Sequence, residues 1–228
     1  MTVSSPRIGL MVPINNTTME PELLAWLPAG ATCRTLRIPR QQGLLTLADI
    51  PAYAARGLAL ARDLRNDDLH VVVYGCTAAG ILAGRTRDAE IVAGLTEATG
   101  APTISTVGAM MSWLEQSGAK AIALVTPYQD DVNQQLRALV EGAGITIRVL
   151  STFGTRTVNE LGRITAAQVA ARAREVMRDD CDGMFVACSQ LPTRAILDGL
   201  QREFGRPLSS SIHATAWQAR RVLALAEA

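Results

Sequence analysis

Two segments of this chain share one pattern, and their separation constrains the fold more than any other feature of the sequence. Residues 67–77 read DDLHVVVYGCT and residues 179–189 read DDCDGMFVACS. A shift of 112 positions aligns the paired aspartates, the apolar runs, and Cys76 with Cys188. Each cysteine is followed directly by a hydroxyl residue. The repeat therefore predicts two like halves, each with a cysteine at the end of a strand.

A second pair of segments supports this repeat. RIGLMVPI at residues 7–14 resembles AIALVTPY at residues 121–128, and a shift of 114 positions aligns Pro13 with Pro127. Short apolar runs match by chance more easily than cysteine–hydroxyl pairs do. The pairs therefore carry most of the argument for two halves.

Strand and helix patterns alternate along the chain. Apolar runs predict strands at 7–12, 32–38, 71–74, 103–105, 121–126, 145–151 and 183–189. Helical spacing predicts helices at 46–65, from 77, at 88–99, 107–116, 130–142, 166–178, up to Phe204, and from about His213 to the end. Residues 154–164 are expected as an irregular loop, and 207–211 as a short connection. Such alternation is typical of parallel sheets with right-handed crossovers.

The predicted fold is α/β, with two pseudo-symmetric parallel-sheet halves and an active site between them. We place the first half at residues 1–104, joined by a C-terminal helix at 211–228, and the second half at 105–210. In parallel α/β sheets, ligands bind at the carboxyl ends of the strands. Two halves that face each other would bring both cysteines to one cleft.

Composition excludes several classes of partner. The chain has 228 residues, of which 48% are hydrophobic and 19% charged, and a net charge of +1. This balance favours a globular protein and gives no basis for binding nucleic acid or an anionic membrane. No apolar run approaches the roughly 20 residues of a membrane helix. The start, MTVSSPRIGLMVP, lacks a signal-peptide pattern, so we expect a cytoplasmic protein with reduced thiols.

The four cysteines and two histidines do not have the spacing of a metal site. We therefore expect no metal. Cys76 follows a strand and Gly75 and comes just before a predicted helix, a position where a thiolate is stabilised. A single cysteine at a strand end is usually structural, but two at matched ends favour function. Cys33 lies inside a strand and is interpreted as a packed thiol.

At these positions the chain resembles a known family. The segments VPINNTTMEPE, VVVYGCTAAG, VTPYQDDVN and VACSQLPT, with the loop around Asn159, resemble the maleate cis–trans isomerases. Those enzymes belong to the aspartate/glutamate racemase superfamily, together with arylmalonate decarboxylases and hydantoin racemases. The resemblance covers nearly the whole chain. It departs at Ser189 and Gln190, where threonine and asparagine are common, and at Asn15, which is often a serine.

The resemblance implies a cofactor-independent conversion of maleate to fumarate. Cys76 would add to the alkene and form a succinyl-type adduct, whose single bond rotates before the thiolate leaves. Cys188 would deprotonate Cys76 or exchange a proton with the adduct, and the sequence does not choose between these roles. The implied catalytic residues are Cys76 and Cys188, and the implied substrate-binding residues are Asn16, Thr77, Tyr128, Asn159 and Ser189. The sequence has no GxGxxG or P-loop motif, in keeping with the absence of a cofactor.

Other interpretations remain open from the sequence. The paired thiols also suit a two-base racemase or epimerase, an arylmalonate-type decarboxylase needs only the second cysteine, and a ligand-binding relative needs neither. Asn15 or Asn16 equally suits a helix N-cap, His213 is interpreted as structural, and Arg156 as a solvated loop residue or a carboxylate ligand. The expected partner is a small dicarboxylate, either maleate or a substituted analogue. Relatives are commonly homodimers or higher homo-oligomers, so we expect one here.

Overall fold

Two four-stranded parallel sheets organise the computed structural model, which describes residues 5–40 and 43–225. The strand order is β2-β1-β3-β4 in the first sheet and β6-β5-β7-β8 in the second. The strands are β1 (Arg7–Pro13), β2 (Thr32–Ile38), β3 (Val71–Tyr74), β4 (Thr103–Ser105), β5 (Ala121–Thr126), β6 (Thr146–Thr152), β7 (Gly183–Val186) and β8 (Leu208–Ser210). The two orders are equivalent, so the predicted pair of pseudo-symmetric α/β halves is confirmed.

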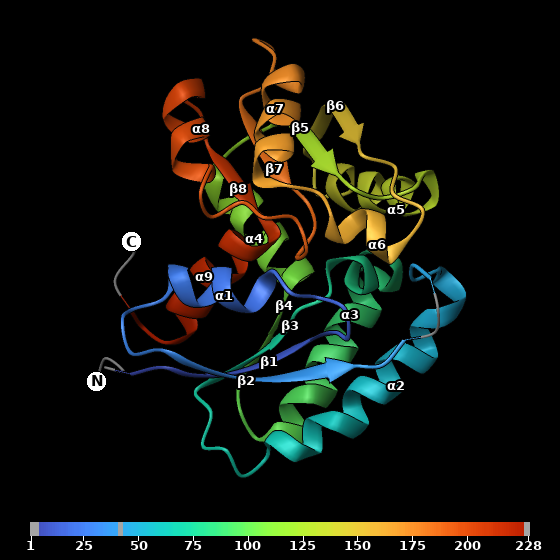
Figure 1. The fold of residues 1–228 in the computed structure, drawn as a ribbon, viewed down its shortest axis with the longest axis vertical. Helices are drawn as coiled ribbons and strands as arrows, with labels where there is room; N and C mark the ends of the chain where they lie inside the picture. Colours follow the sequence, from blue (N-terminus) through green and yellow to red (C-terminus); the bar gives the residue numbers. More distant parts are fainter. Residues whose placement is uncertain (1–4, 41–42, 226–228) are drawn as a thin grey trace.

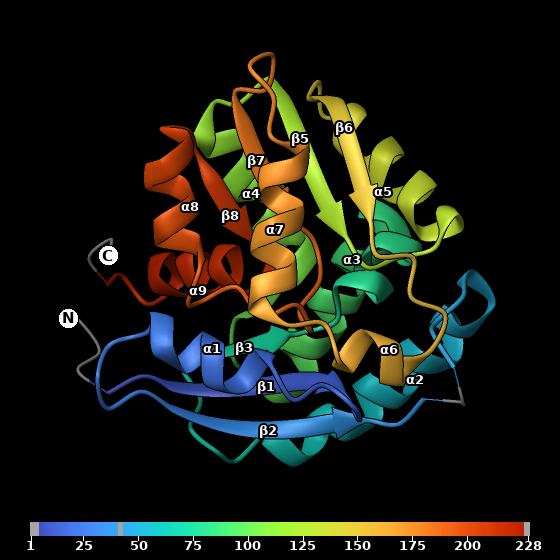
Figure 2. The ribbon, with the colours of Figure 1, turned by 45° about the horizontal axis from the view of Figure 1, so that its top comes forward.

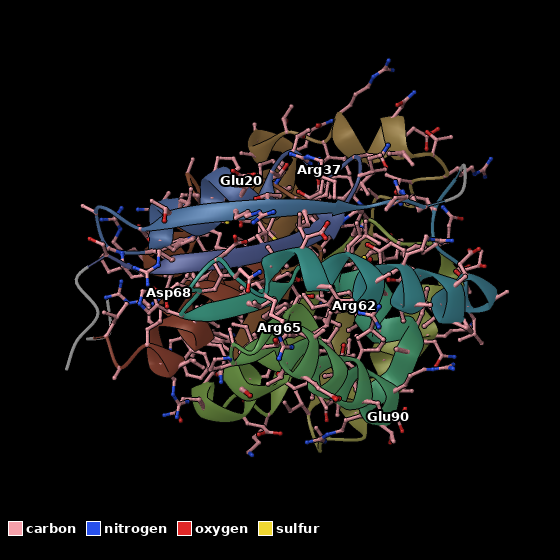
Figure 3. The ribbon with its side chains drawn as sticks, turned by 90° about the horizontal axis from the view of Figure 1, so that it is seen from below. Glu20, Arg37, Arg62, Arg65, Asp68 and Glu90 are labelled. Carbon is pink, nitrogen blue, oxygen red and sulfur yellow. The ribbon has the colours of Figure 1, made fainter. Side chains whose placement is uncertain are left out.

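Helices cover both faces of each sheet (Figures 1 and 2). They are α1 (Met19–Trp26), α2 (Ile50–Ala61), α3 (Thr77–Thr99), α4 (Thr106–Ser117), α5 (Asp130–Glu141), α6 (Val158–Gly162), α7 (Ala166–Val176), α8 (Leu197–Phe204) and α9 (Ser211–Val222). On the first sheet, α1 and α9 pack against one face, and α2 and α3 pack against the other. The exposed side of this helix pair carries charged residues such as Glu90 on α3 and Arg62, which directly follows α2 (Figure 3). The cores therefore lie between each sheet and its helices.

Each half contributes one helix to the packing of the other. Helix α4 follows the first sheet, but its Trp113 ring lies 6.1 Å from the ring of Phe185 in the second sheet. Helix α9 follows the second sheet and buries Ile212 and Ala216 among β1 and β3 of the first. The helices α4 and α9 also pack against each other. This exchange is in keeping with the proposed division at 1–104 with 211–228 and 105–210, which stays a prediction.

Four elements differ from the predicted ones. Residues 207–211 contain the strand β8, which is too short for its sequence to show a period, and residues 154–164 contain the helix α6, which Thr157 caps. The two helices expected between 77 and 99 form one element with a break at Gly84. The expected helix at 46–65 is α2 flanked by single 3₁₀ turns, η1 (Leu47–Asp49) and η2 (Arg62–Leu64).

Within residues 5–40 and 43–225, the helices are all too short or too polar to cross a bilayer.

Candidate active site

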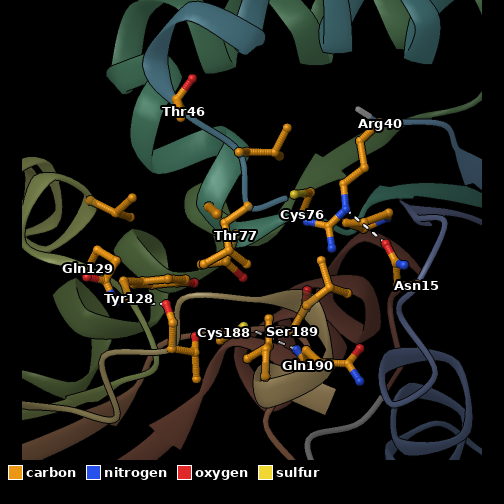
Figure 4. A pocket seen from close by; sticks show the side chains of 18 of the residues that line it. Asn15, Arg40, Thr46, Cys76, Thr77, Tyr128, Gln129, Cys188, Ser189 and Gln190 are labelled. Atoms are coloured by element: carbon orange, nitrogen blue, oxygen red, sulfur yellow. Dashed lines mark hydrogen bonds between the residues drawn. The ribbon is translucent and has the colours of Figure 1, made fainter. Parts of the chain in front are cut away.

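A cavity of about 630 Å³ opens where the carboxyl ends of the two sheets face each other (Figure 4). Its lining includes both candidate cysteines, Cys76 from the first half and Cys188 from the second. Four of the five predicted substrate-binding residues also line it: Asn16, Thr77, Tyr128 and Ser189. The volume is within the usual range for small-molecule sites. Sequence segments more than a hundred residues apart thus meet at one site.

Cys76 lies between the end of β3 and the first turn of α3. Gly75 lets Met19 pack closely against the chain before Cys76, because a Cβ there would approach the Met19 sulfur to 2.7 Å. Burial raises the pKa of the Cys76 thiol above its ordinary value. Four neighbouring groups lower this pKa in opposition to burial. They are the backbone N–H groups of Ala79 and Ala78, the Tyr53 hydroxyl and the positive charge of Arg40. The thiol is therefore neutral at rest and stands in a field that favours its thiolate.

Cys188 has a different setting from its counterpart in the repeat. It is followed by a turn rather than a helix, since α8 begins only at Leu197. The Gln190 N–H donates to the Cys188 sulfur at 3.4 Å. Burial raises the pKa of Cys188 to about 11, although this N–H and the Tyr128 hydroxyl partly oppose the shift. The second thiol is thus also a protonated acid at neutral pH.

Two hydroxyl groups in the cavity wall have no hydrogen-bond partner in the described residues. They belong to Tyr128 and Thr77, and both oxygens are buried. Burial and the neighbouring Cys188 and Cys76 raise the pKa of Tyr128 well above its ordinary value, so this phenol stays neutral. Buried polar groups are normally paired. Both hydroxyls can therefore donate to an acceptor on a molecule in the cavity.

Asn16 and Ser189 join the two halves at the cavity. The Asn16 Nδ2 donates to the Ser189 carbonyl oxygen at 3.0 Å and to its hydroxyl at 3.2 Å. The Ser189 hydroxyl donates to the Gly75 carbonyl oxygen at 2.9 Å. The Asn16 Oδ1 accepts from the N–H groups of Thr18 at 3.1 Å and Met19 at 2.9 Å. Asn16 therefore lines the cavity and also accepts from the first N–H of α1, although the N-cap residue of that helix is Thr18.

Asn159 lies apart from this group. It is exposed on α6, whereas its neighbours Val158 and Leu161 line the cavity. Arg156 also lines the cavity from an exposed position, and its N–H donates to Glu160 at 2.7 Å. A substrate-binding role for Asn159 stays a prediction.

Sequence reasoning missed several lining residues. Arg40 follows β2 at the same sheet edge as Cys76, so the rule that selected Cys76 would also have selected it. Gln190 accepts from the Thr17 N–H at 3.1 Å and donates to its hydroxyl at 3.3 Å, which no local pattern indicates. Tyr53 lies behind Cys76 in the core, and its hydroxyl lacks a hydrogen-bond partner. Among the described residues, no cluster of three His, Cys, Asp or Glu side chains could hold a metal ion.

Sequence comparisons identify relatives across nearly the whole chain. A family model described as arylmalonate decarboxylase matches residues 8–228. The maleate isomerase of Nocardia farcinica is 29% identical over 96% of this chain and 90% of its own length. The arylmalonate decarboxylase of Bordetella bronchiseptica is 29% identical over 71% of this chain and 68% of its own.

Solved structures agree with these matches. A cysteine-to-serine mutant of the Nocardia farcinica maleate cis–trans isomerase, with a covalently bound succinylcysteine intermediate, has a TM-score of 0.87 at 27% identity and covers 96% of this chain and 93% of its own. A maleate isomerase from Pseudomonas putida, at 22% identity, shares the fold with a TM-score of 0.89 over 97% of this chain and 94% of its own. The resemblance predicted from the sequence is confirmed.

Proposed function

Because the chain belongs to the arylmalonate decarboxylase family, we propose the reaction of that family that its cavity supports best, the cis–trans isomerisation of maleate to fumarate. One observation carries the proposal. Two buried thiols, one from each half, line a single cavity in a chain whose full-length curated relatives include maleate isomerases. A thiolate is a soft nucleophile, and an alkene carbon activated by a carboxylate is a suitable electrophile for it.

The first step adds Cys76 across the double bond of maleate. The sulfur forms a bond to one alkene carbon, and the π electron pair moves to the other carbon and its carboxylate. Cys188 delivers its proton to that second carbon while it takes up the proton that Cys76 releases. The product is a succinyl adduct on Cys76, with both protons accounted for. The raised pKa of Cys188, about 11, keeps it protonated for this task.

The second step reverses the addition after a rotation. The former double bond is now single, so the carboxylates can turn to the more stable trans arrangement. The carbon–sulfur bond breaks and its electron pair restores the Cys76 thiolate, while the neighbouring carbon gives a proton to Cys188 and its C–H electron pair re-forms the double bond. Cys188 passes the proton that it already held to the Cys76 thiolate, so both thiols are protonated again. Fumarate leaves with no net change in electrons or protons. The chemistry therefore requires no oxidant or reductant.

Neutral donors stabilise the charge that develops in the first step. The unpartnered hydroxyls of Tyr128 and Thr77 are available to a substrate carboxylate, and preorganised donors of this kind supply much of the rate enhancement in many enzymes. Asn16 and Ser189 are hydrogen-bonded to each other and hold the turn beside Cys188, and their polar side chains also line the cavity. Asn159 would reach the substrate only after α6 turns toward the cavity, so its proposed role includes that movement.

We also propose a cytoplasmic location and a homo-oligomeric state. The four cysteines are all free, which suits a reducing compartment. The oligomer rests on the family resemblance alone.

Proton NMR tests the proposed reaction directly. Purified protein is incubated with maleate under reducing conditions, without added cofactor, and we expect fumarate's vinyl signal to appear. Parallel samples contain substituted maleates, an aryl malonate, and an amino acid or hydantoin in deuterated water. Intact maleate together with loss of CO₂ from the malonate would favour the decarboxylase, which the family match and the Bordetella relative make the second candidate.

A further inference from the structure

One arginine in the cavity wall has no place in the mechanism above. Arg40 follows β2, is half-buried, and lines the cavity on the side of Cys76. Figure 4 shows its guanidinium between Cys76 and Asn15. Its Nε donates to the Asn15 Oδ1 at 2.9 Å. This single hydrogen bond orients the group and leaves its terminal edge facing the cavity.

The terminal nitrogens of Arg40 are uncommitted. Within residues 5–40 and 43–225, neither makes a hydrogen bond, and no carboxylate oxygen lies within 4.0 Å of the guanidinium. Several other arginines are paired with carboxylates, as Arg174 is with Glu203 at 2.8 Å. A guanidinium presents two parallel N–H groups that match the two oxygens of a carboxylate. The free edge of Arg40 is therefore a ready site for a carboxylate.

The charge of Arg40 already acts on the reacting group. It is among the groups that lower the pKa of the Cys76 thiol, in opposition to burial. The polar groups on the other side of Cys76, Thr77 and Tyr128, are neutral donors. Acidic Asp130 lines the cavity at the start of α5, beside Tyr128 and away from Arg40. Asp131 and the cationic Arg156 also line the cavity, but of the two lining arginines only Arg40 acts on the Cys76 thiol. A dianion that reacts at Cys76 would therefore have the charge of Arg40 beside it.

We propose that Arg40 binds one carboxylate of the substrate through its terminal nitrogens, while the neutral hydroxyls bind the other, so that Arg40 selects dicarboxylates over monocarboxylates. The identity of the dicarboxylate rests on the proposed function, whereas the anion site rests on the cavity alone. The orientation follows from the positions of the groups. With one carboxylate on Arg40, the adjoining alkene carbon lies toward Cys76.

Alkylation with a matched pair of reagents tests the anion site without any assumption about the reaction. Iodoacetate is an anion and iodoacetamide is its neutral counterpart, so the ratio of their rates at Cys76 reports the local charge. Peptide mass mapping follows modification of Cys76. We expect Arg40→Gln to lower this ratio about tenfold, the order expected for a charge-assisted contact in a partly buried site. Because both reagents attack the same sulfur, a change in thiol pKa cancels from the ratio.

Three variants serve as comparisons. Arg62→Gln removes an equal charge from an exposed position on the outside of the first half and should leave the ratio unchanged (Figure 3). Arg40→Lys should keep part of the ratio that Arg40→Gln loses, since lysine keeps the positive charge but lacks the two parallel N–H groups of the guanidinium. Asn15→Ala keeps the charge of Arg40 and should change the ratio far less than Arg40→Gln. Circular dichroism melts verify that each variant is folded.

Steady-state kinetics then test the role in substrate selection. With maleate, Arg40→Gln should raise KM at least about tenfold, and protection of Cys76 by succinate should weaken in parallel. An unchanged ratio and an unchanged KM in Arg40→Gln would overturn the inference, as would an equal loss in Asn15→Ala or a loss in Arg156→Gln instead. If maleate is not a substrate but the ratio falls, the anion site stands and the proposed reaction fails.

Discussion

Tyr128 has a buried hydroxyl beside Cys188 that has no hydrogen-bond partner among the described residues. We expect Tyr128→Phe to lower kcat by about 10²–10³, the usual cost of losing one donor to a developing oxyanion. The same change should leave thermal stability unchanged or slightly higher, because the hydroxyl has no hydrogen-bond partner among the described residues. Tyr74→Phe is the matched control, since it removes another buried, unpartnered hydroxyl outside the cavity lining. A fall in kcat for Tyr74→Phe alone, or for neither variant, would contradict this role.

The thiols should respond to pH above the ordinary range. Burial raises the pKa of Cys188 from 9.0 to about 11. Only the thiolate is alkylated, so the iodoacetamide rate at Cys188 should keep rising from pH 9 toward pH 11, where a free thiol has already levelled off.

The raised pKa of Cys188 also affects folding, because the folded state holds this proton more tightly than the unfolded chain does. Its contribution to stability is complete below about pH 9 and is lost as pH rises toward 11. A plateau near pH 9 in the rate of Cys188 alkylation would contradict the raised pKa.

At this scale the sequence predicted the groups that sit at strand ends. Cys76, Thr77, Cys188 and Ser189 follow apolar runs directly, so their shared sheet edge can be inferred from the chain alone. Arg40 stands at an equivalent edge after β2, but arginine is common in exposed loops and nothing local distinguishes it. Arg40 is recognised as a cavity residue only in the folded structure, where the second half encloses the cavity.

The helix α3 carries Cys76 at its start and breaks at Gly84. The backbone there has φ 71° and ψ 168°, a region open essentially to glycine alone, and a Cβ at this position would meet no atom within 4 Å. We expect Gly84→Ala to destabilise the fold by about 1–3 kcal/mol through backbone strain, not through a clash. Urea denaturation followed by circular dichroism measures this change.

Gly199 provides the matched control. It lies exposed in α8, has no positive φ, and has open space around its Cβ position. Gly199→Ala should therefore stabilise the protein by about 0.5–1 kcal/mol, as alanine does within a helix. The same substitution should thus have opposite signs at the two positions. Equal signs would show that the break in α3 is not held by its glycine.

Long elements were predictable and short ones were not. Buried strands such as β3 and β5 have continuous apolar runs, and α5 has a clear helical period. The strand β8 has three residues and α6 has five, too few to show a period. They exist because β7 offers an open edge to β8 and because Thr157 caps α6, and both causes lie outside the local pattern.

The whole molecule depends on contacts between its halves. Beyond the cavity, the Glu22 carboxylate accepts from the N–H of Thr193 at 2.9 Å and of Arg194 at 3.1 Å. These bonds fix the chain that follows Cys188 onto α1. Glu22→Ala should cost on the order of 2 kcal/mol, because two backbone donors lose a charged acceptor. Glu20→Ala, in the same first turn of α1 but without a hydrogen bond among the described residues, should cost only a few tenths.

Chemical denaturation of both variants measures the difference. A single shared transition is expected in each case, since the halves exchange α4 and α9 and the larger of two buried core clusters includes residues of both halves. Equal stability of the two variants, or separate transitions for the halves, would contradict this account of the interface.

The pair of halves could be predicted from the repeat in the sequence, because matched strand and cysteine positions recur at a fixed separation. The helix α9 was also expected over the first half. The predicted division at residue 105 assigned the helix at 107–116 to the second half, and α4 packs its Trp113 ring near Phe185 of the second sheet. The place of Arg40 in the cavity wall was not predicted, because it depends on how the two halves meet.

The most direct test of the central claim is mass spectrometry of Cys188→Ser after incubation with maleate. Without the second thiol, formation and breakdown of the adduct should both slow, and the adduct, once formed, should persist and accumulate over a long incubation. We predict a mass gain of one maleic acid per chain, mapped to Cys76, with little fumarate formed. An adduct on another residue, or undiminished conversion of maleate in Cys76→Ala, would contradict covalent catalysis by Cys76.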